Sequence, residues 1–479
     1  MFRTVGDQPT LWEAILPDEL RRLPAELARV DGLLDDPVFF TPFARFFDPR
    51  IGRPSTPMET YLRLMFLKFR YGLGFESLCR EVSDSITWRQ FCRIGLDQPV
   101  PHPTTLMKLT TRCGSAAVDG LNEALLAKAA EAKLLRCSRV RVDTTVVPAN
   151  VAYPTDSGLL AKAVRRIAVT GRRIQAAGGA VRTKLRDRSR AAGRRAHDLN
   201  AKLRTRSATA RDEALAVVRR KNAELADLAE TAAAEAERLL ANAKRALRMA
   251  RTKAAELAAT GCKDAAAGRR RGRLARAVND LAELLEATRT IAAQTRQRVA
   301  GVTPDGSTRR VSLHDPDARP IAKGRLGKPV EFGAKAQVCD NDDGIVLDHD
   351  VLPGNPADAA RLEPAIQRII KRTGRKPRTV AADRGYGEQA VDDALHEAGV
   401  RDVVIPRKGR PSKARLAVEH RRAFRRHVKW RTGSEGRIST LKRGYGWDRS
   451  RIDTTEGARI WVGHGVLAHN LTKISALAG

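Results

Sequence analysis

The sequence lacks the features that mark a zinc protein, a secreted protein or a membrane protein. Its six cysteines are scattered and include no C-x-x-C pair, which argues against a zinc site and, in a cytosolic chain, against disulfides. We expect these cysteines to be small buried hydrophobic side chains. The first residues have no apolar signal-peptide core, and no apolar run approaches the roughly 18 residues of a membrane span. We therefore expect a cytosolic protein.

Acidic residues are too few to balance the basic ones. The chain has 88 Lys and Arg against 55 Asp and Glu, which gives a formal net charge of +33. Such a charge predicts a polyanionic partner, and nucleic acid fits better than an anionic membrane. Part of the excess would also follow from an Ala- and Arg-rich genome. At 479 residues, the chain is long enough for about three domains.

The stretch RVRVDTTVVPANVAYPTD, from Arg139 to Asp156, contains a carboxylate inside an apolar strand pattern. Valines and threonines form a β-branched run that ends at Pro148, and Asp143 lies in its middle. A buried carboxylate is costly unless something pairs with it. The functional interpretation is a site residue, and the alternative is an aspartate that ends the strand and caps a turn.

A second carboxylate follows another short apolar run. Thr379 to Ala382 reads as a strand, Asp383 closes it, and a helix is predicted from Glu388 to Ala398. The carboxyl end of a strand is where open α/β sheets place their ligands. The alternative is again a helix cap.

A third carboxylate lies in WRTGSEGRISTLKR, near the carboxyl end of the chain. If this stretch is helical, Arg431, Glu435 and Lys442 fall on one face. The alternative is a solvated face with an i,i+4 ion pair worth a few tenths of a kcal/mol. Gly433 and Gly436 each cost about 1 kcal/mol in a helix. They would instead allow a backbone or a phosphate to come close.

Together these residues resemble the DDE transposases of bacterial insertion sequences. That family has two Asp and one Glu, with the Glu in a Y-x(2)-R-x(3)-E-x(6)-K signature. Arg431, Glu435 and Lys442 match this spacing, and Val428 occupies the tyrosine position. The stretches VDTTVVPANVAYPTD, SLHDPDARPIAKGRLGKPVEFG and ADRGYG are similar to the insertion-sequence group called "not classified yet".

The resemblance implies a fold, a site and a reaction. The fold is an α/β ribonuclease-H-like core with a mixed sheet, and Asp143, Asp383 and Glu435 hold two catalytic ions. Because no histidine cluster or thiolate pair lies nearby in the sequence, the set is oxygen-only and suits Mg²⁺ or Mn²⁺. The reaction is cleavage at the ends of the element and strand transfer into target DNA. DNA phosphates would contact Arg431, Lys442, Arg437, Arg443 and Arg384.

The resemblance also implies the binding partners. They are double-stranded DNA, both the terminal inverted repeats and the target, and further copies of the chain. We expect at least a homodimer in the active complex and a cytoplasmic, nucleoid-associated protein. Two other classes of function stay open. One is a metal-dependent nuclease or resolvase on the same fold, and the other is a non-catalytic DNA-binding protein, such as a decayed transposase. A Ser or Tyr recombinase would not explain the three acidic residues.

Composition predicts the domain boundaries. Residues 1–125 form an all-α domain for DNA binding, 126–156 begin the catalytic domain, 157–302 are a long basic helical insertion, and 303–479 complete the catalytic domain. The alternative role of the first domain is to brace the catalytic core or a dimer contact. The insertion reads as a helical hairpin whose basic first third either follows DNA phosphates or is a solvated, partly disordered arm.

Local patterns predict further details. A capping box at Thr56 to Glu59 opens a helix, and short helices with Arg80, Arg89 and Arg93 exposed suit a helix-turn-helix reader. Two strands, near residues 329–339 and 344–352, are joined by an acidic turn that we interpret as a solvated hairpin tip rather than a cation site.

Overall fold

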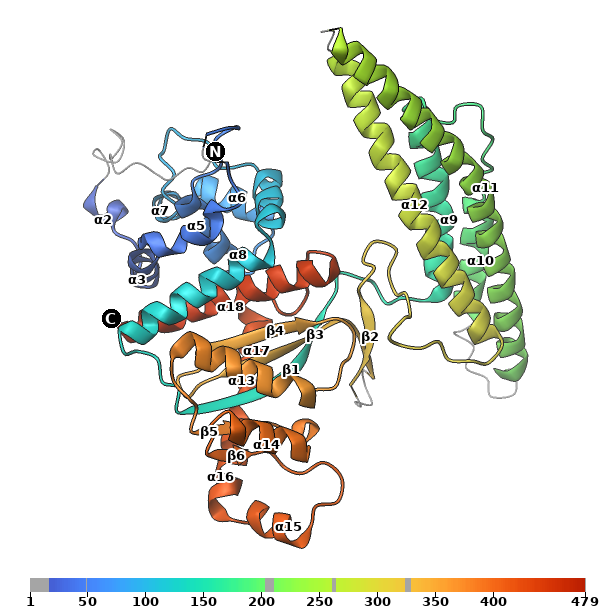
Figure 1. The fold of residues 1–479 in the computed structure, drawn as a ribbon. Helices are drawn as coiled ribbons and strands as arrows, with labels where there is room; N and C mark the ends of the chain where they lie inside the picture. Colours follow the sequence, from blue (N-terminus) through green and yellow to red (C-terminus); the bar gives the residue numbers. More distant parts are fainter. Residues whose placement is uncertain (1–16, 49, 203–210, 261–263, 324–328, 479) are drawn as a thin grey trace. The chain divides into compact units, whose positions relative to one another are not determined.

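A computed structural model describes residues 17–48, 50–202, 211–260, 264–323 and 329–478 (Figure 1). The chain divides into two compact units, which we describe separately. The first unit combines Met1–Asn150 with Ile321–Gly479, and the second is Val151–Pro320.

The described amino-terminal part of the first unit is helical. Helices were predicted at residues 58–69, 75–82 and 86–92 and from residue 104, and each is confirmed. The capping box is wrong, because Pro57 is the N-cap and no side chain caps this helix. The elements are α2 (Asp18–Arg21), α3 (Ala25–Leu34), η1 (Pro37–Phe39), α4 (Thr41–Ala44), α5 (Met58–Arg70), α6 (Phe75–Asp84), α7 (Ile86–Phe91) and α8 (Pro103–Glu131).

The remainder of the first unit contains a mixed sheet. Its order is β2-β3-β1-β5-β6, and β4 also pairs with β3. Strand β1 is antiparallel to β3 and parallel to β5. Five of these strands were predicted from the sequence, including one at residues 402–405, and are confirmed, and β2 is additional. The strands are β1 (Arg139–Pro148), β2 (Arg319–Ala322), β3 (Val330–Asp340), β4 (Val346–Leu352), β5 (Thr379–Ala381) and β6 (Asp402–Val404).

Helices cover both faces of this sheet (Figure 1). Neighbouring residues of β4 point to opposite faces. Asp348 pairs with Arg368 and Arg372 of α13 (Ala359–Thr373), whereas His349 lies 3.7 Å from Asp119 of α8. Helix α18 (Thr454–Ala478) lies on the α8 side, as the predicted closing helix requires. A mixed sheet with many helices was predicted and is confirmed at this level.

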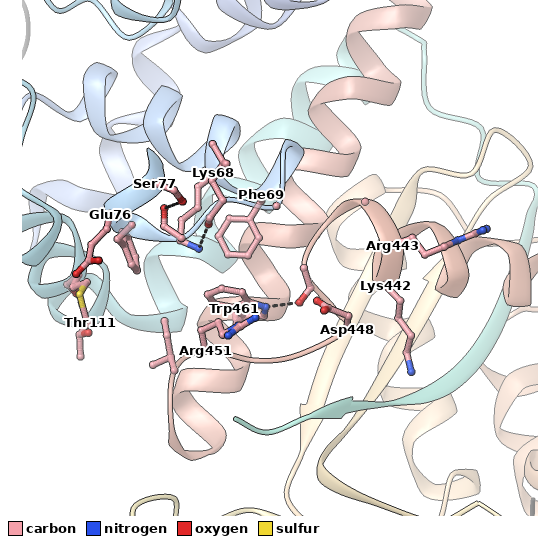
Figure 2. A pocket seen from close by; sticks show the side chains of 18 of the residues that line it. Lys68, Phe69, Glu76, Ser77, Thr111, Lys442, Arg443, Asp448, Arg451 and Trp461 are labelled. Carbon is pink, nitrogen blue, oxygen red and sulfur yellow. Dashed lines mark hydrogen bonds between the residues drawn. The ribbon is translucent and has the colours of Figure 1, made fainter. Parts of the chain in front are cut away.

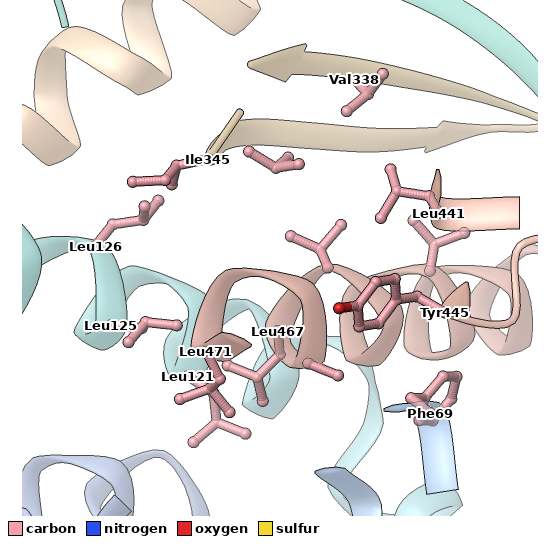
Figure 3. Close-up of a cluster of buried hydrophobic side chains, with 14 of the residues drawn as sticks. Phe69, Leu121, Leu125, Leu126, Val338, Ile345, Leu441, Tyr445, Leu467 and Leu471 are labelled. Carbon is pink, nitrogen blue, oxygen red and sulfur yellow. The ribbon is translucent and has the colours of Figure 1, made fainter. Parts of the chain in front are cut away.

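One apolar core joins the helical part to the sheet. Figure 3 shows leucines of α8 and α18 facing Val338 of β3 and Ile345, with Leu441 and Tyr445 beside them. On the other side of α18, the Phe69 ring of α5 packs edge-on against Trp461, with ring centroids 4.8 Å apart. The helical part and the sheet therefore share a single packed interior.

The acidic turn after β3 differs from its prediction as a solvated hairpin tip. Asp340 and Asn341 are fully buried. Asp342 lies 2.7 Å from the Arg139 guanidinium, and Asp343 lies 3.6 Å from that of Arg136. The prediction was wrong because arginines from a distant part of the sequence lie beside the turn.

The second unit, where the structure describes it, is helical. Its helices pack on an alanine- and leucine-rich interior, and α9 contributes Leu160, Val164 and Ile167 to it. Where the structure describes it, the basic first third thus consists of two packed helices and is not a solvated arm. The sequence predicted a break near Gly193 and a connection between two long helices that included Gly268. Both predictions are wrong, since Gly193 lies within α10 and Gly268 within α12. The helices are α9 (Asp156–Ala176), α10 (Ser189–Lys202), α11 (Arg211–Ala259) and α12 (Ala265–Val299).

Two of the sequence predictions fall outside the described residues. They are the connection between helices at Gly261 and the burial of Cys262. The other cysteines are free, and their predicted burial is confirmed: Cys79, Cys92, Cys113, Cys137 and Cys339. Among the described helices, none combines the length and the apolar character needed to cross a membrane.

Candidate active site

The first two predicted carboxylates lie side by side on neighbouring strands of the sheet. Arg141 of β1 is the register partner of Ala381 of β5, and the two strands are parallel. Asp143 and Asp383 each follow two residues later, Asp143 within β1 and Asp383 just beyond the carboxyl end of β5, so they lie on neighbouring strands that are about 5 Å apart. Asp383 also caps the short helix η2 (Arg384–Tyr386), where it accepts a hydrogen bond from the Gly385 N–H at 2.8 Å. The alternative predicted for Asp383, a helix cap, is therefore confirmed, and it does not exclude a functional role.

The environment of Asp143 disfavours its negative charge. The pKa of Asp143 is raised to about 6, chiefly by burial and to a smaller extent by the nearby carboxylates of Asp383 and Glu435, while the Thr144 N–H and Arg431 act in the opposite direction. Its side chain is 13 % exposed. A bound cation stabilises the ionised form of neighbouring carboxylates and so offsets the repulsion between their negative charges.

The third carboxylate is held near Asp143 through an arginine. Helix α16 (Arg422–Arg431) continues almost directly into α17 (Gly433–Gly444), because Thr432 between them is α-helical. Arg431 donates to the Asp143 carboxylate at 3.3 Å and lies 3.9 Å from the Glu435 carboxylate. The guanidinium therefore lies between two of the predicted site carboxylates.

Asp143 and Glu435 border a cleft of about 470 Å³, whereas Asp383 and Arg431 are not among the residues that line it. Glu435 extends from α17 with 72 % of its side chain exposed, whereas Asp143 lies deeper on β1. The cleft holds carboxylates and cations together, so it suits a polyanionic ligand that also brings metal ions. Its lining residues are Asp143, Thr144, Thr145, Lys323, Glu331, Glu435, Ile438, Ser439, Lys442 and Arg443.

The structure places some of the residues predicted to contact phosphates at or near the cleft, and one of them away from it. Lys442 and Arg443 line the cleft, and Arg384 is exposed next to Asp383. Arg437 is not placed for this role, because its guanidinium is buried against Asp340 at 3.3 Å. Helical spacing showed that Arg437 belongs to α17, but not that a buried carboxylate lies beside it.

A divalent ion fits the chemistry of these residues. In the described part of the chain, no three His, Cys, Asp or Glu side chains are gathered tightly enough to form a ready metal site. The donors are nevertheless carboxylate oxygens, and burial together with the neighbouring carboxylates of Asp383 and Glu435 raises the pKa of Asp143. Oxygen donors of this kind suit Mg²⁺ or Mn²⁺, with Asp143, Asp383 and Glu435 as the residues that would hold them.

A larger groove of about 1120 Å³ lies between the amino-terminal helices and the segment that joins α17 to α18 (Figure 2). Lys442 and Arg443 line this groove as well as the cleft, so the two are neighbours. Arg80 and Arg451 add positive charge to its lining.

Two of the three arginines predicted to be exposed on the short helices have structural partners instead. Arg89 donates to the Gly95 and Gln98 carbonyl oxygens, and Arg93 forms an ion pair with Asp35. Arg80 alone of the three is exposed, which leaves it available to a ligand in the groove.

Comparisons with known proteins point in one direction. Residues 16–112 match a family described as a transposase domain (DUF772), and residues 304–471 match the transposase DDE domain. The chain carries the DDE domain of transposases. The predicted resemblance is therefore confirmed. The chain is also similar to a Rhizobium meliloti protein named "Uncharacterized protein ORF8 in nfe locus", with 29% identity over 147 residues, which is 29% of this chain and 70% of that protein. No solved structure matches.

The DDE domain match covers part of the site. Asp383 and Glu435 lie within residues 304–471, whereas Asp143 lies in the interval between the two transposase matches. The sheet accounts for this separation, because β1 precedes the second unit in the chain and pairs with β3 and β5 that follow it.

Sequence reasoning missed three residues at or beside the site. Glu331 and Lys323 line the cleft, and their charged groups are 3.3 Å apart. Both lie in SLHDPDARPIAKGRLGKPVEFG, a stretch that carries the family resemblance but did not point to these two residues. Asp340 was assigned to a solvated turn, although its neighbour in space is Arg141 of the Asp143 strand.

Proposed function

We propose that this transposase cleaves DNA at the ends of an insertion sequence and transfers the strands into target DNA, with Asp143, Asp383 and Glu435 as its catalytic carboxylates. The carrying observation is that Asp143 and Glu435, nearly 300 residues apart, border one cleft, while Asp383 is close enough to raise the pKa of Asp143. The mixed sheet with helices on both faces supports a ribonuclease-H-like fold.

The three carboxylates and two neighbouring cations have separate tasks in this proposal. Two Mg²⁺ ions, when bound by the carboxylates, supply activation of the attacking hydroxyl and stabilisation of the leaving oxygen. Asp143 is held deep on β1 and so fixes the position of the ligand set. Arg431 and Lys442 bind phosphate oxygens beside the carboxylates, and the planar guanidinium of Arg431 suits bidentate contact.

DNA that leaves the cleft passes along the larger groove in this proposal. Lys442 and Arg443 belong to both cavities, and Arg80 and Arg451 extend the positive lining. The helical domain of residues 1–125 would thereby contact DNA. The terminal repeats and target are its DNA partners, and the active complex contains at least two copies of the chain.

Replacing Arg443 with glutamine is expected to weaken DNA binding without changing sequence preference. Removing one phosphate contact should reduce the slope of log K against log salt by about 1. Fluorescence anisotropy with a labelled duplex measures this slope. A salt range of about 50 to 200 mM is suitable, because phosphate contacts make the affinity fall steeply across it. Arg375→Gln is the matched control, because Arg375 is exposed and precedes β5 at the end opposite Asp383. An equal slope change in both variants would contradict this path.

The two other classes of function predict different products. A ribonuclease-H-like nuclease would cut DNA regardless of end sequence and would not join strands. A binding relic would do neither. Incubation of the purified chain with Mg²⁺, a duplex carrying the repeats that flank its gene and a target plasmid distinguishes them: end-specific cuts and joined products support the proposal, and their absence contradicts it.

A further inference from the structure

The strand that carries Asp143 and the helix that carries Glu435 are joined by one buried carboxylate. Asp340, at the end of β3, is fully buried. Arg141, two residues before Asp143, donates to it with Nη2 at 2.7 Å and Nε at 3.0 Å. Arg437, two residues after Glu435, donates to the same carboxylate at 3.3 Å.

Further contacts hold the two arginines in place. Arg141 also donates to the Trp430 carbonyl oxygen at 3.2 Å, at the end of α16. The Arg437 guanidinium lies 3.4 Å from His469 of α18, which in turn contacts the Gly344 carbonyl oxygen at 2.9 Å. Side chains on β1, β3, α17 and α18 thus form one connected polar network.

Two glycines leave room for this network. A Cβ at Gly433 would lie 2.1 Å from Arg141 Nη1, and a Cβ at Gly344 would lie 1.6 Å from Arg437 Nη2. Gly344 also has φ of +75°, which side chains rarely adopt. The sequence predicted that a backbone or a phosphate comes close to Gly433, but the group that lies there is the protein's own Arg141 side chain. By contrast, a Cβ at Gly436 would meet nothing within 4 Å.

We propose that Asp340 is a positioning residue for catalysis: through Arg141 and Arg437 it fixes the distance between Asp143 and Glu435, and so prepares the carboxylates for divalent metal. This inference rests on the proposed function. Asp340 does not line the cleft, so its effect is transmitted by the two arginines. Loss of an outer partner of metal ligands typically lowers metal affinity or activity by about 10–100-fold.

The chain offers a matched control. Asp348 of β4 is a buried carboxylate that also pairs with two arginines, Arg368 and Arg372, but on the face covered by α13. Asp348→Asn removes the same kind of buried ion pair as Asp340→Asn, away from the cleft. A second pair of variants leaves all charges in place: Gly433→Ala displaces Arg141, whereas Gly436→Ala does not.

The experiment compares these four full-length variants and wild type for melting temperature, DNA affinity, Mn²⁺ binding by calorimetry, and cleavage rate at saturating flanking-repeat duplex. We expect Asp340→Asn and Gly433→Ala to weaken Mn²⁺ binding about 10-fold and to slow cleavage about 10- to 100-fold, with DNA affinity within about twofold. Asp348→Asn and Gly436→Ala should retain wild-type Mn²⁺ binding and rate, even where the melting temperature falls.

Two outcomes overturn the proposal. Equal losses of Mn²⁺ binding and rate in Asp340→Asn and Asp348→Asn would show that Asp340 acts only on stability, and if Asp340→Asn does not fold, equal behaviour of the two glycine variants decides in the same way. In both cases active wild type keeps the proposed function intact. Wild type that neither binds Mn²⁺ nor cleaves removes the proposed function and this inference together.

Discussion

Replacing Asp143 with asparagine is expected to reduce DNA cleavage by about a thousandfold or more and to leave DNA affinity within about twofold. Asparagine has the same shape but removes the negative charge that a divalent ion needs. Asp143 is the deepest of the three carboxylates at the strand edge, and it is the one whose charge the others disfavour. Because Lys442 and Arg443 remain in place, electrostatic DNA binding should persist.

The control for this substitution is Asp392→Asn. Asp392 is also buried and pairs with Arg407 and Arg415, but it lies on α14 (Gln389–Glu397), outside the residues that line the cleft. Single-turnover cleavage and anisotropy measure rate and affinity in both variants. An Asp143→Asn protein that cleaves within tenfold of wild type would remove Asp143 from the site, whatever the effect of Asp392→Asn.

Replacing Lys68 with methionine is expected to stabilise the protein at pH 7 by roughly 2–4 kcal/mol. Lys68 is 2% exposed, and burial lowers its pKa from about 10.5 to about 7, with Arg451 acting in the same direction. The Phe69, Phe75 and Trp461 rings lie 4.2–4.7 Å from its ammonium nitrogen and stabilise the charged form only in part. Methionine fills similar space without a charge to desolvate.

The sign of the pH dependence follows from the lowered pKa. Below about pH 7 both the folded and the unfolded chain bind this proton, so the full cost of Lys68 is present. Between about pH 7 and pH 10 the unfolded chain alone retains it, so wild-type stability rises with pH relative to Lys68→Met. Denaturant unfolding at several pH values measures the difference. Lys108→Met, at an exposed position of α8, should show no such trend. A Lys68→Met protein less stable than wild type at pH 7 would contradict this assignment.

The strand edge that carries Asp143 and Asp383 could be predicted because both residues close or interrupt unmistakable apolar runs. Alternation and turn residues indicate strands, and the chain order of elements indicates that the two strands are neighbours. Glu435 could be predicted from its spacing to Arg431 and Lys442, and the 3.9 Å approach of Arg431 to Glu435 agrees with a helical i,i+4 pair.

The Asp340 network could not be predicted for a physical reason. An aspartate in the turn sequence Asp340-Asn341-Asp342-Asp343 looks solvated when only its sequence neighbours are considered. Its actual partner, Arg141, is almost 200 residues away and becomes adjacent through the antiparallel register of β1 and β3. Arg437 was misassigned for the same reason, since periodicity identifies a helix face but not what packs against it.

The packed face of the basic insertion could not be predicted from its composition. Leu160, Val164 and Ile167 lie three or four residues apart on α9 and are buried, but arginine and lysine dominate the surrounding sequence. Because charge dominates the composition of this segment, the sequence indicates a phosphate contact or a solvated arm and not a packed helix face.

Cleavage of an end-labelled duplex carrying the repeats that flank the gene, in Mg²⁺ or EDTA, tests the central claim most directly. Wild type and Glu435→Gln are compared at saturating DNA, and Glu388→Gln serves as an exposed control outside the cleft lining. We predict Mg²⁺-dependent nicks at the repeat ends with wild type and Glu388→Gln, and none with Glu435→Gln. Cleavage by Glu435→Gln at the wild-type rate, or cleavage by wild type in EDTA, would contradict the account.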